Sequence, residues 1–189
     1  MNPRKFSAAG RTTIGWTSGT STEIFIHPPG ADFQSRNFLF RISTATVEAE
    51  ESTFTFFEGI TRHLMILKGE LELIHEGRYT KHLRPFQQDT FSGEWKTRSR
   101  GKVTDFNLML KGGTSGFLKH HHLDVKTEFD LSPAGRFHFV YLVSGTALSD
   151  NGELLVQGDL LRLEKSASIV IRANEPCDLI EIEVTLKAE

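Results

Sequence analysis

The sequence lacks the features that mark several large classes of protein. Cys177 is its one cysteine in 189 residues, so no intramolecular disulfide can form, and a chain of this length can bury a core without one. No run of about 18 consecutive apolar residues occurs, and residues 1–10 contain no apolar stretch of signal-peptide length. We therefore expect no membrane partner and a cytoplasmic location.

An excess of one sign of charge is also missing. The 22 Lys and Arg residues stand against 24 Asp and Glu, and the pI is about 6.5. This balance creates no positive field that would gather nucleic acid, so we expect no nucleic-acid partner. Tyr and Trp are scarce, two of each beside 15 Phe. Because Phe fills a β core without needing a polar partner, the composition predicts a Phe-rich interior.

Long amphipathic helical patterns are absent, although 123–131 is ambiguous. Many short strands at regular spacing instead predict an all-β sandwich or barrel. Turn signals such as Glu76-Gly77 and Asp150-Asn151-Gly152 separate the expected strands. The runs with period-two alternation are 22–27, 38–45, 63–67, 70–75, 106–110, 137–143, 159–163, 168–172 and 179–186.

One pattern occurs twice along the chain. In 62–73 and again in 138–148, a hydrophobic strand runs into a Gly, Gly69 or Gly145, and a second strand follows. This repeat predicts two similar halves. The order of strand, Gly, strand and polar turn resembles that of jelly-roll β-barrels of the cupin type, and two such halves would form a bicupin. The Gly-rich stretch 111–116 is the natural join, which gives an N-terminal half, 1–110, with the candidate pocket, and a C-terminal half, 111–189.

Metal-binding cupins resemble one another in the spacing of two His and one Glu before such a Gly. Anchored on Gly69 or on Gly145, those six ligand positions hold only two residues that could bind a metal, and they lie in different halves. A first-row metal needs three or four converging donors, so we expect no metal and no cofactor. The six residues are Phe56, Glu58 and Arg62, then Ser132, Ala134 and His138.

The run His120-His121-His122 is the alternative metal candidate, because His120 and His122 would share one side of an extended strand. We expect it to lie instead in a solvated segment that joins the halves. The remaining histidines are expected to be surface residues or satisfied strand residues: His27, His63, His75, His82 and His138.

Unusual polar residues gather in the first half. Trp16 leads a hydroxyl-rich loop that includes Ser18, and its simplest interpretation is an ordinary turn. Period-two alternation puts Arg41 and Ser43 on one face of a strand. If that face lines the barrel, an anion is expected beside Arg41, and otherwise the arginine is merely exposed.

Two further segments add to this candidate ligand site. Arg62 begins the repeat strand, and its planar guanidinium suits a carboxylate rather than a metal. Asp105 and Asn107 share one face of a strand whose alternate residues are apolar. They could bind a ligand or hold an arginine in place, and for Asp105 a structural salt bridge is an equal alternative.

At these residues the chain resembles the HutD/Ves family, small bicupins linked to bacterial histidine utilisation and stress responses. The resemblance covers most of 16–109, but where family members carry a basic residue and Asn after the Trp, this chain has Thr17-Ser18-Gly19-Thr20. The resemblance implies binding of a small carboxylate metabolite and a regulatory role. Its residues are Trp16, Gly19, Thr22-Glu23-Ile24, Asp32-Phe33, Arg41 to Ala45, Phe54, Phe57, Gly59, Arg62, Leu67, Gly69, Leu83, Pro85, Phe91, Gly93 and Asp105 to Met109.

Three classes of function stay open. The first is a metal-independent protein that binds a small acid and senses amino-acid catabolism. The second is a metal-independent enzyme, an isomerase, lyase or hydrolase, with Asp105 or Glu58 as general base. No nucleophile–base pair is visible, and an Asp paired with Arg should have a depressed pKa, so no catalytic residue is assigned. The third is a structural module with a filled barrel, and exposed edge strands leave a homo-oligomer open.

Overall fold

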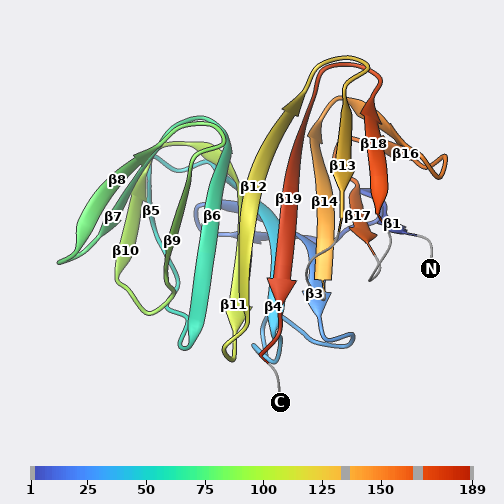
Figure 1. The fold of residues 1–189 in the computed structure, drawn as a ribbon. Coiled ribbons are helices and arrows are strands. Elements are labelled where there is room, and N and C mark those ends of the chain that lie inside the picture. Colours follow the sequence, from blue (N-terminus) through green and yellow to red (C-terminus); the bar gives the residue numbers. More distant parts are fainter. Residues whose placement is uncertain (1–2, 133–136, 164–167, 188–189) are drawn as a thin grey trace. The chain divides into compact units, whose positions relative to one another are not determined.

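The computed structural model describes residues 3–132, 137–163 and 168–187, and every helix or strand assigned within these ranges is a β-strand (Figure 1). The all-β class predicted from the alternating runs is confirmed. Within the same ranges there is no helix of the length and apolarity that a membrane crossing requires.

The chain forms two compact units. The N-terminal unit comprises 11–114, and the C-terminal unit comprises 115–189 together with 1–10. The strands of the N-terminal unit are β2 (Thr13–Trp16), β3 (Gly19–His27), β4 (Phe40–Val47), β5 (Glu51–Thr53), β6 (Ile60–Lys68), β7 (Leu71–His75), β8 (Tyr79–Leu83), β9 (Gln88–Ser92), β10 (Thr97–Arg100) and β11 (Val103–Lys111). Those of the C-terminal unit are β1 (Arg4–Phe6), β12 (Ser115–Leu123), β13 (Glu128–Leu131), β14 (Phe137–Ser144), β15 (Thr146–Ser149), β16 (Leu154–Val156), β17 (Leu160–Leu163), β18 (Ile169–Ala173) and β19 (Cys177–Thr185).

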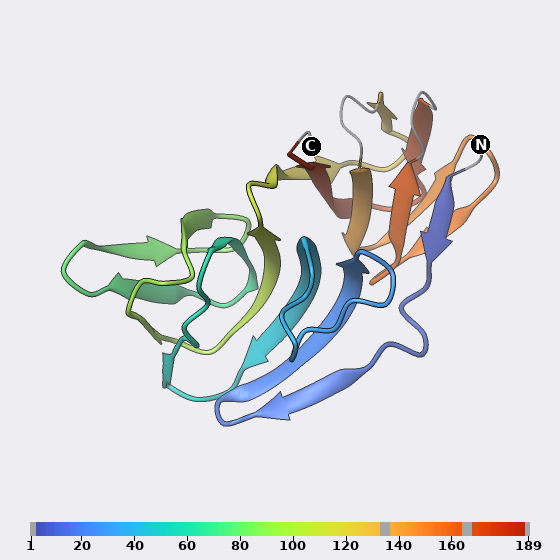
Figure 2. The same cartoon turned by 90° about the horizontal axis from the view of Figure 1, so that it is seen from below.

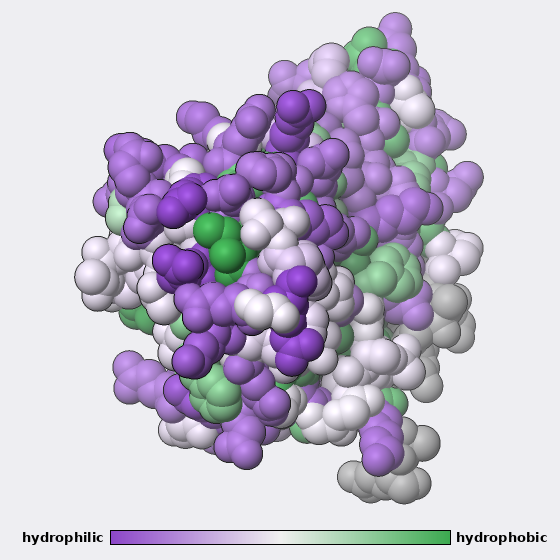
Figure 3. All heavy atoms as spheres, turned by 90° about the vertical axis from the view of Figure 1, so that its left-hand side faces the viewer, coloured by the Kyte–Doolittle hydropathy of each residue, from purple (hydrophilic) through white to green (hydrophobic). Residues whose placement is uncertain are grey.

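The N-terminal unit is built from two antiparallel sheets. One has the strand order β2-β3-β4-β11-β6-β9, and the other has the order β5-β10-β7-β8. Buried apolar residues of both sheets pack in one cluster, which includes Leu64 and Ile66 from β6 and Leu71 and Leu73 from β7. Viewed from the side of Figure 1 on which the β7–β8 hairpin lies, the surface is mainly hydrophilic (Figure 3).

The C-terminal unit repeats this topology. Its strands β12-β19-β14-β17 follow the order of β4-β11-β6-β9, and β13-β18-β15-β16 follows β5-β10-β7-β8. The glycines that revealed the repeat occupy equivalent turns, with φ of 85° at Gly69 and 77° at Gly145. The prediction of two jelly-roll halves with an internal repeat is therefore confirmed.

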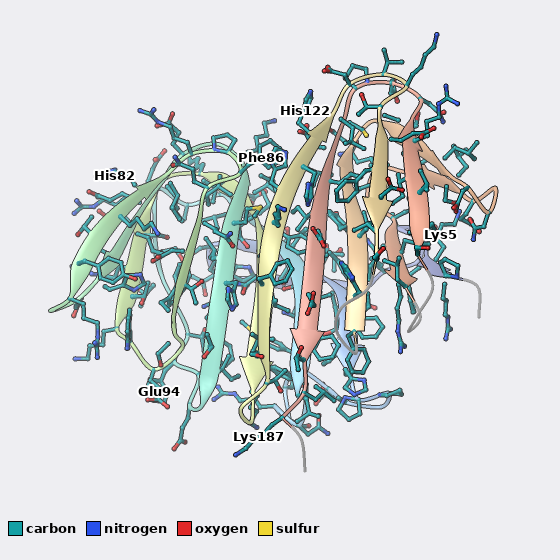
Figure 4. The ribbon with its side chains drawn as sticks, viewed as in Figure 1. Lys5, His82, Phe86, Glu94, His122 and Lys187 are labelled. Atoms are coloured by element: carbon teal, nitrogen blue, oxygen red, sulfur yellow. The ribbon has the colours of Figure 1, made fainter. Side chains whose placement is uncertain are left out.

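Residues 3–10 belong to the C-terminal unit. Strand β1 pairs antiparallel with β17 and places Phe6 opposite Leu160, so β1 extends the sheet at its edge (Figure 2). Lys5, labelled in Figure 4, forms an ion pair with Glu153 at 2.6 Å. The Ala8 N–H donates to Asp159 at 3.1 Å.

The nine alternating runs all fall on strands, but the histidine run does not lie where the sequence suggested. His120 to His122 belong to β12, which pairs with β19, rather than to a solvated joining segment. Both His120 and His122 lie 2.9 Å from one oxygen of Asp178. The expectation was wrong because both faces of β12 carry polar residues, so the sequence of this strand shows no alternation of apolar and polar residues.

Among the remaining histidines, His75 is the most enclosed. It is 1% exposed, and its ring nitrogens lie 2.8 Å from Thr97 Oγ1 and 3.0 Å from Asp89 Oδ2. This is the satisfied strand histidine that the sequence predicted. His82, labelled in Figure 4, shows the other predicted case, because its side chain is 77% exposed.

A candidate ligand-binding hollow in the N-terminal unit

One face of the six-stranded sheet carries the polar residues that the sequence singled out. Antiparallel pairing places Met109 of β11 between Arg41 of β4 and Arg62 of β6. Two residues back along β11, Asn107 lies opposite Ser43. Because side chains alternate along a strand, all five of these side chains share one face, which also carries Asp105.

This face lines a cavity of about 320 Å³, here called the N-terminal hollow. The volume lies at the lower end of the range for small-molecule sites. Of the seven predicted site residues, six line it: Trp16, Arg41, Ser43, Arg62, Asp105 and Asn107. Its other lining residues are Ile14, Ser21, Phe33, Gln34, Arg36, Ala45, Val47, Ser52, Thr53, Phe54, Thr55, Phe57 and Met109.

Arg41 is buried, and one side of its guanidinium is hydrogen-bonded to neighbouring side chains. Its Nε donates to Glu23 at 2.9 Å, and an Nη donates to Ser43 Oγ at 2.9 Å. The guanidinium carbon lies 4.2 Å from the ring centroid of Phe33, a distance suited to a cation–π contact. Glu23 therefore balances the charge of Arg41 before any ligand arrives.

Arg62 is held differently. It is 7% exposed, and its guanidinium lies 4.7 Å from the ring centroid of Phe54 and 5.4 Å from that of Phe91. Within the described part of the chain, its Nε has no hydrogen-bond partner. Burial lowers the pKa of Arg62 to about 10, Asp105 opposes this shift, and the like charge of Arg41 adds to it. The guanidinium thus stays charged at neutral pH.

Asp105 and Asn107 present two further buried polar atoms to the hollow. The residues are 4% and 5% exposed, and among the described residues neither Oδ1 has a hydrogen-bond partner. Burial raises the pKa of Asp105 to about 7, although Arg62 opposes the shift. The expectation that Asp105 would have a depressed pKa is therefore wrong, because desolvation outweighs the attraction of Arg62.

Ser18, the seventh predicted residue, lies outside this cavity. It occupies the two-residue turn between β2 and β3, where its carbonyl accepts the N–H groups of Glu48 and Ala49. With Thr17 it lines a second cavity of about 460 Å³. Trp16 and residues 52, 53 and 55 line both cavities, so they form a shared wall.

Several lining residues escaped the sequence analysis. Arg36 adds a third arginine at the rim, with its guanidinium 4.9 Å from the ring centroid of Phe57. Ser52 contributes a buried hydroxyl that has no hydrogen-bond partner in the described part of the chain. The arginines of the hollow contact Phe rings that are distant in sequence, so no local pattern reveals these contacts. A loop arginine such as Arg36 also carries no periodic signal.

The residues at the cupin metal positions do not fit a metal in the N-terminal unit. Phe56 is 57% exposed, Glu58 lies in the turn before β6, and Arg62 brings a fixed positive charge into the cavity. A permanent cation repels a metal ion and offers no lone pair. No cluster of three His, Cys, Asp or Glu residues suited to a metal occurs in the described ranges.

In the C-terminal unit the equivalent strands carry a different set of residues. His138 lies 2.9 Å from one oxygen of Glu181, and His121 lies 2.8 Å from the other oxygen. Ala134 falls outside the described residues, and Ser132 is exposed. This unit therefore pairs its partly buried Glu181 carboxylate with histidines, whereas in the N-terminal hollow Asp105 Oδ1 has no hydrogen-bond partner among the described residues.

The fold and the hollow together define a bicupin with an arginine-rich cavity in its N-terminal half. Residues 9–180 match the family model described as HutD, so the chain belongs to the HutD family. A protein from Pseudomonas putida, described as an uncharacterized 21.2 kDa protein in the hutC 3'region, is 34% identical over 76 residues. That alignment covers 38% of this chain and only 40% of the relative.

Solved structures show the same fold over nearly the whole chain. A conserved protein of unknown function, PA5104 from Pseudomonas aeruginosa PAO1, aligns with a TM-score of 0.83 and 20% identity, over 98% of this chain and 100% of that chain. HutD from Pseudomonas fluorescens SBW25 aligns at 0.74 with 23% identity and the same coverage. The bacterial pirin YhhW from Escherichia coli, solved with nickel(II), aligns at 0.73 with 12% identity, again over 98% and 100%.

Proposed function

We propose that the protein binds a small carboxylate metabolite in the N-terminal hollow without a metal, and acts as a sensor or regulator of histidine utilisation. The observation that carries the binding proposal is the buried Arg62, whose Nε has no hydrogen-bond partner within the described residues. A buried donor on a charged group is costly to leave unpaired, and a ligand carboxylate would supply the missing acceptor.

The surroundings of Arg62 favour an anion. Arg41 and Arg36 line the same hollow, while Asp105 is its one acidic lining residue among those described. A charge-assisted hydrogen bond contributes about 1.5–3 kcal/mol. Two such bonds contribute about 3–6 kcal/mol, less than the roughly 8 kcal/mol that micromolar affinity requires, so apolar contacts with the rings that line the hollow must supply the rest.

The regulatory part of the proposal depends on the family. Membership of the HutD family and the relative described by its position in the hutC 3'region support a link with histidine utilisation. A sensor fits a cavity that binds reversibly, because its occupancy then follows the metabolite concentration.

The test of binding is calorimetry with small mono- and dicarboxylic acids on wild-type protein and two variants. Arg62→Met keeps an apolar stem under the Phe rings but removes the charge, so we expect at least roughly tenfold weaker binding. Arg84→Met removes an exposed arginine of the same unit, 74% exposed, and should leave affinity unchanged. Equal affinity of the Arg62 variant and the wild type would contradict the proposal.

A second candidate function is proton transfer, because Asp105 combines a place in the hollow with a pKa near 7. A general base is most effective when its pKa is close to the working pH. Asp105 would take a proton from a carbon of the bound acid, forming an O–H bond, while the electron pair moves toward the carboxylate held by Arg62. Deuterium incorporation into bound acids in D₂O, lost in Asp105→Asn, tests this activity, and its absence with wild-type protein rules it out.

A further inference from the structure

The second cavity, of about 460 Å³, adjoins the N-terminal hollow but has a different lining. Ile74 of β7 and Thr53 of β5 lie on either side of Arg98 of β10, and all three residues line the cavity. Their side chains share one face of the four-stranded sheet, because directly paired residues point the same way. Leu73, on the other face, belongs to the apolar core cluster. The cavity therefore has one wall on the outward face of this sheet.

The arginines of the second cavity are already paired with carboxylates. Arg98 Nε lies 2.9 Å from an oxygen of Glu76. Arg100 Nε lies 3.0 Å from an oxygen of Glu51, and an Nη lies 3.4 Å from Glu72. Two guanidinium groups thus face three carboxylates, so an anion that enters this cavity meets no excess of positive charge. The lining favours a neutral ligand that offers both donors and acceptors.

The free edge of β5 supplies further donors and acceptors. This strand ends its sheet, and the Phe54 N–H donates to the Thr97 carbonyl of β10. Because backbone groups alternate between the two sides of a strand, those of Glu51 and Thr53 point away from β10. Both residues line the cavity. Two residues are too few to hold an added peptide strand, but their N–H and C=O groups suit the hydroxyls of a small ligand.

Apolar surface lies beside these polar groups. Trp16, 39% exposed, lines the cavity together with Ile74, and the turn residues Thr17 and Ser18 that follow Trp16 line it as well. An indole face packs against the C–H groups of a saturated ring, while hydroxyls at the rim of that ring reach the polar groups around it.

We propose that the second cavity binds a neutral, polyhydroxylated ring, that is, a pyranose sugar or a closely similar polyol. Each hydroxyl of such a ligand is a donor and an acceptor, so it is satisfied by guanidinium, carboxylate and backbone groups alike. The volume lies within the range of small-molecule sites. The site is independent of acid binding in the N-terminal hollow.

The two tryptophans of the chain supply the reporter for a test. Trp16 lines the cavity, whereas Trp95 packs against the apolar core cluster and lines neither cavity. In protein labelled with 5-fluorotryptophan, the ¹⁹F signal of Trp16 follows occupancy of the cavity, and the signal of Trp95 is the internal control.

The probes share one oxygen-containing ring and differ in hydroxyls and charge. The methyl glycosides of glucose, galactose and mannose are neutral and carry hydroxyls around the ring, tetrahydropyran-2-methanol lacks the ring hydroxyls, and glucose 6-phosphate adds an anion. At least one glycoside is expected to bind with a Kd of roughly 1 mM or below, at least about tenfold more tightly than tetrahydropyran-2-methanol. Glucose 6-phosphate is expected to bind no more tightly than that glycoside.

Variants assign the binding to this cavity. Arg98→Met removes the guanidinium donors and is expected to weaken glycoside binding at least roughly fivefold. Arg84→Met is the matched control, because Arg84 belongs to the same unit and does not line the cavity. Arg62→Met alters the N-terminal hollow alone and should leave glycoside affinity unchanged.

Several results overturn this proposal. In the titrations these are a Trp16 signal that no glycoside moves up to about 50 mM, equal affinity of tetrahydropyran-2-methanol, and tighter binding of glucose 6-phosphate, which marks an anion site. Among the variants, equal affinities of Arg98→Met and Arg84→Met, or weaker glycoside binding by Arg62→Met, which places the sugar in the hollow, have the same consequence. None of these results bears on acid binding, which calorimetry decides separately.

Discussion

At the scale of single residues, the two arginines of the hollow look alike in sequence and differ in the structure. Alternation correctly predicted that Arg41 shares a face with Ser43. It could not predict that Glu23 pairs with Arg41, because a bulge between Glu23 and Phe25 interrupts the alternation of β3. Glu23 and Ile26 therefore lie on one face although they are three residues apart.

Asp105 makes the stability of the protein depend on pH. Its pKa is about 7 in the folded state, above the ordinary value near 3.9 of an unfolded chain. The folded state thus holds a proton that the unfolded state has lost, so this group's contribution to stability is full below pH 4 and is lost as pH rises through 7. Arg62, whose pKa is about 10, stays charged throughout this range.

We expect Asp105→Asn to remove this dependence. The free energy of unfolding of the variant minus that of the wild type should rise by roughly 2–4 kcal/mol between pH 4.5 and pH 8.5. Urea denaturation at several pH values measures the difference. Asp130→Asn, at an exposed position of β13, is the control and should run parallel to the wild type. Parallel curves for Asp105→Asn would show that the carboxyl is not desolvated in solution.

At the scale of strands and turns, the internal repeat could be predicted because each half requires a glycine in the equivalent turn. Gly69 and Gly145 both have positive φ, and a Cβ at either would lie within 2.5 Å of a backbone carbonyl oxygen, that of Lys102 or Pro176. Short polar strands were not readable, since Thr97–Arg100 and the three-residue β5 contain no apolar alternation. Ser52 and Thr53 in the wall of the hollow were missed for the same reason.

Replacing Gly69 with Ala is expected to destabilise the N-terminal unit. The positive φ costs about 1–3 kcal/mol, and the 2.4 Å approach to the Lys102 oxygen adds to it. Gly77→Ala in the β7–β8 turn is a matched control, because Gly77 has φ of 71° but nothing within 4 Å of the added Cβ. In thermal unfolding, the melting temperature of Gly69→Ala should be clearly lower than that of Gly77→Ala. Equal decreases in the two melting temperatures would mean that the contact with the Lys102 carbonyl is relieved without cost.

At the scale of the whole molecule, the sequence predicted two jelly-roll halves but gave no sign that residues 3–10 belong with the second half. Arg4–Phe6 is too short and too charged to read as a strand. Its position depends on pairing with β17, which lies far along the chain. Long-range pairing of this kind is set by tertiary packing, which a local pattern does not contain.

Removing residues 2–8 is therefore expected to loosen the C-terminal unit and leave the N-terminal hollow intact. The edge of β17 would lose its partner, so amide hydrogen exchange should speed up in Leu160–Leu163. Exchange in β4 and β11 should not change. Lys5→Ala, which removes an ion pair but keeps the strand, is the control. Faster exchange spread evenly over both units would contradict this division.

Strand β11 has one consequence for how this protein can change over generations. Its residues alternate between the hollow and an apolar face, with Asp105 and Asn107 on one side and Phe106 and Leu108, both 0% exposed, on the other. Inserting or deleting one codon in β11 would exchange the two sets and spoil both faces at once. Ligand preference in proteins with this fold can therefore change by substitution at every second position of β11, the positions that face the hollow, while the length of the strand is conserved by its packing.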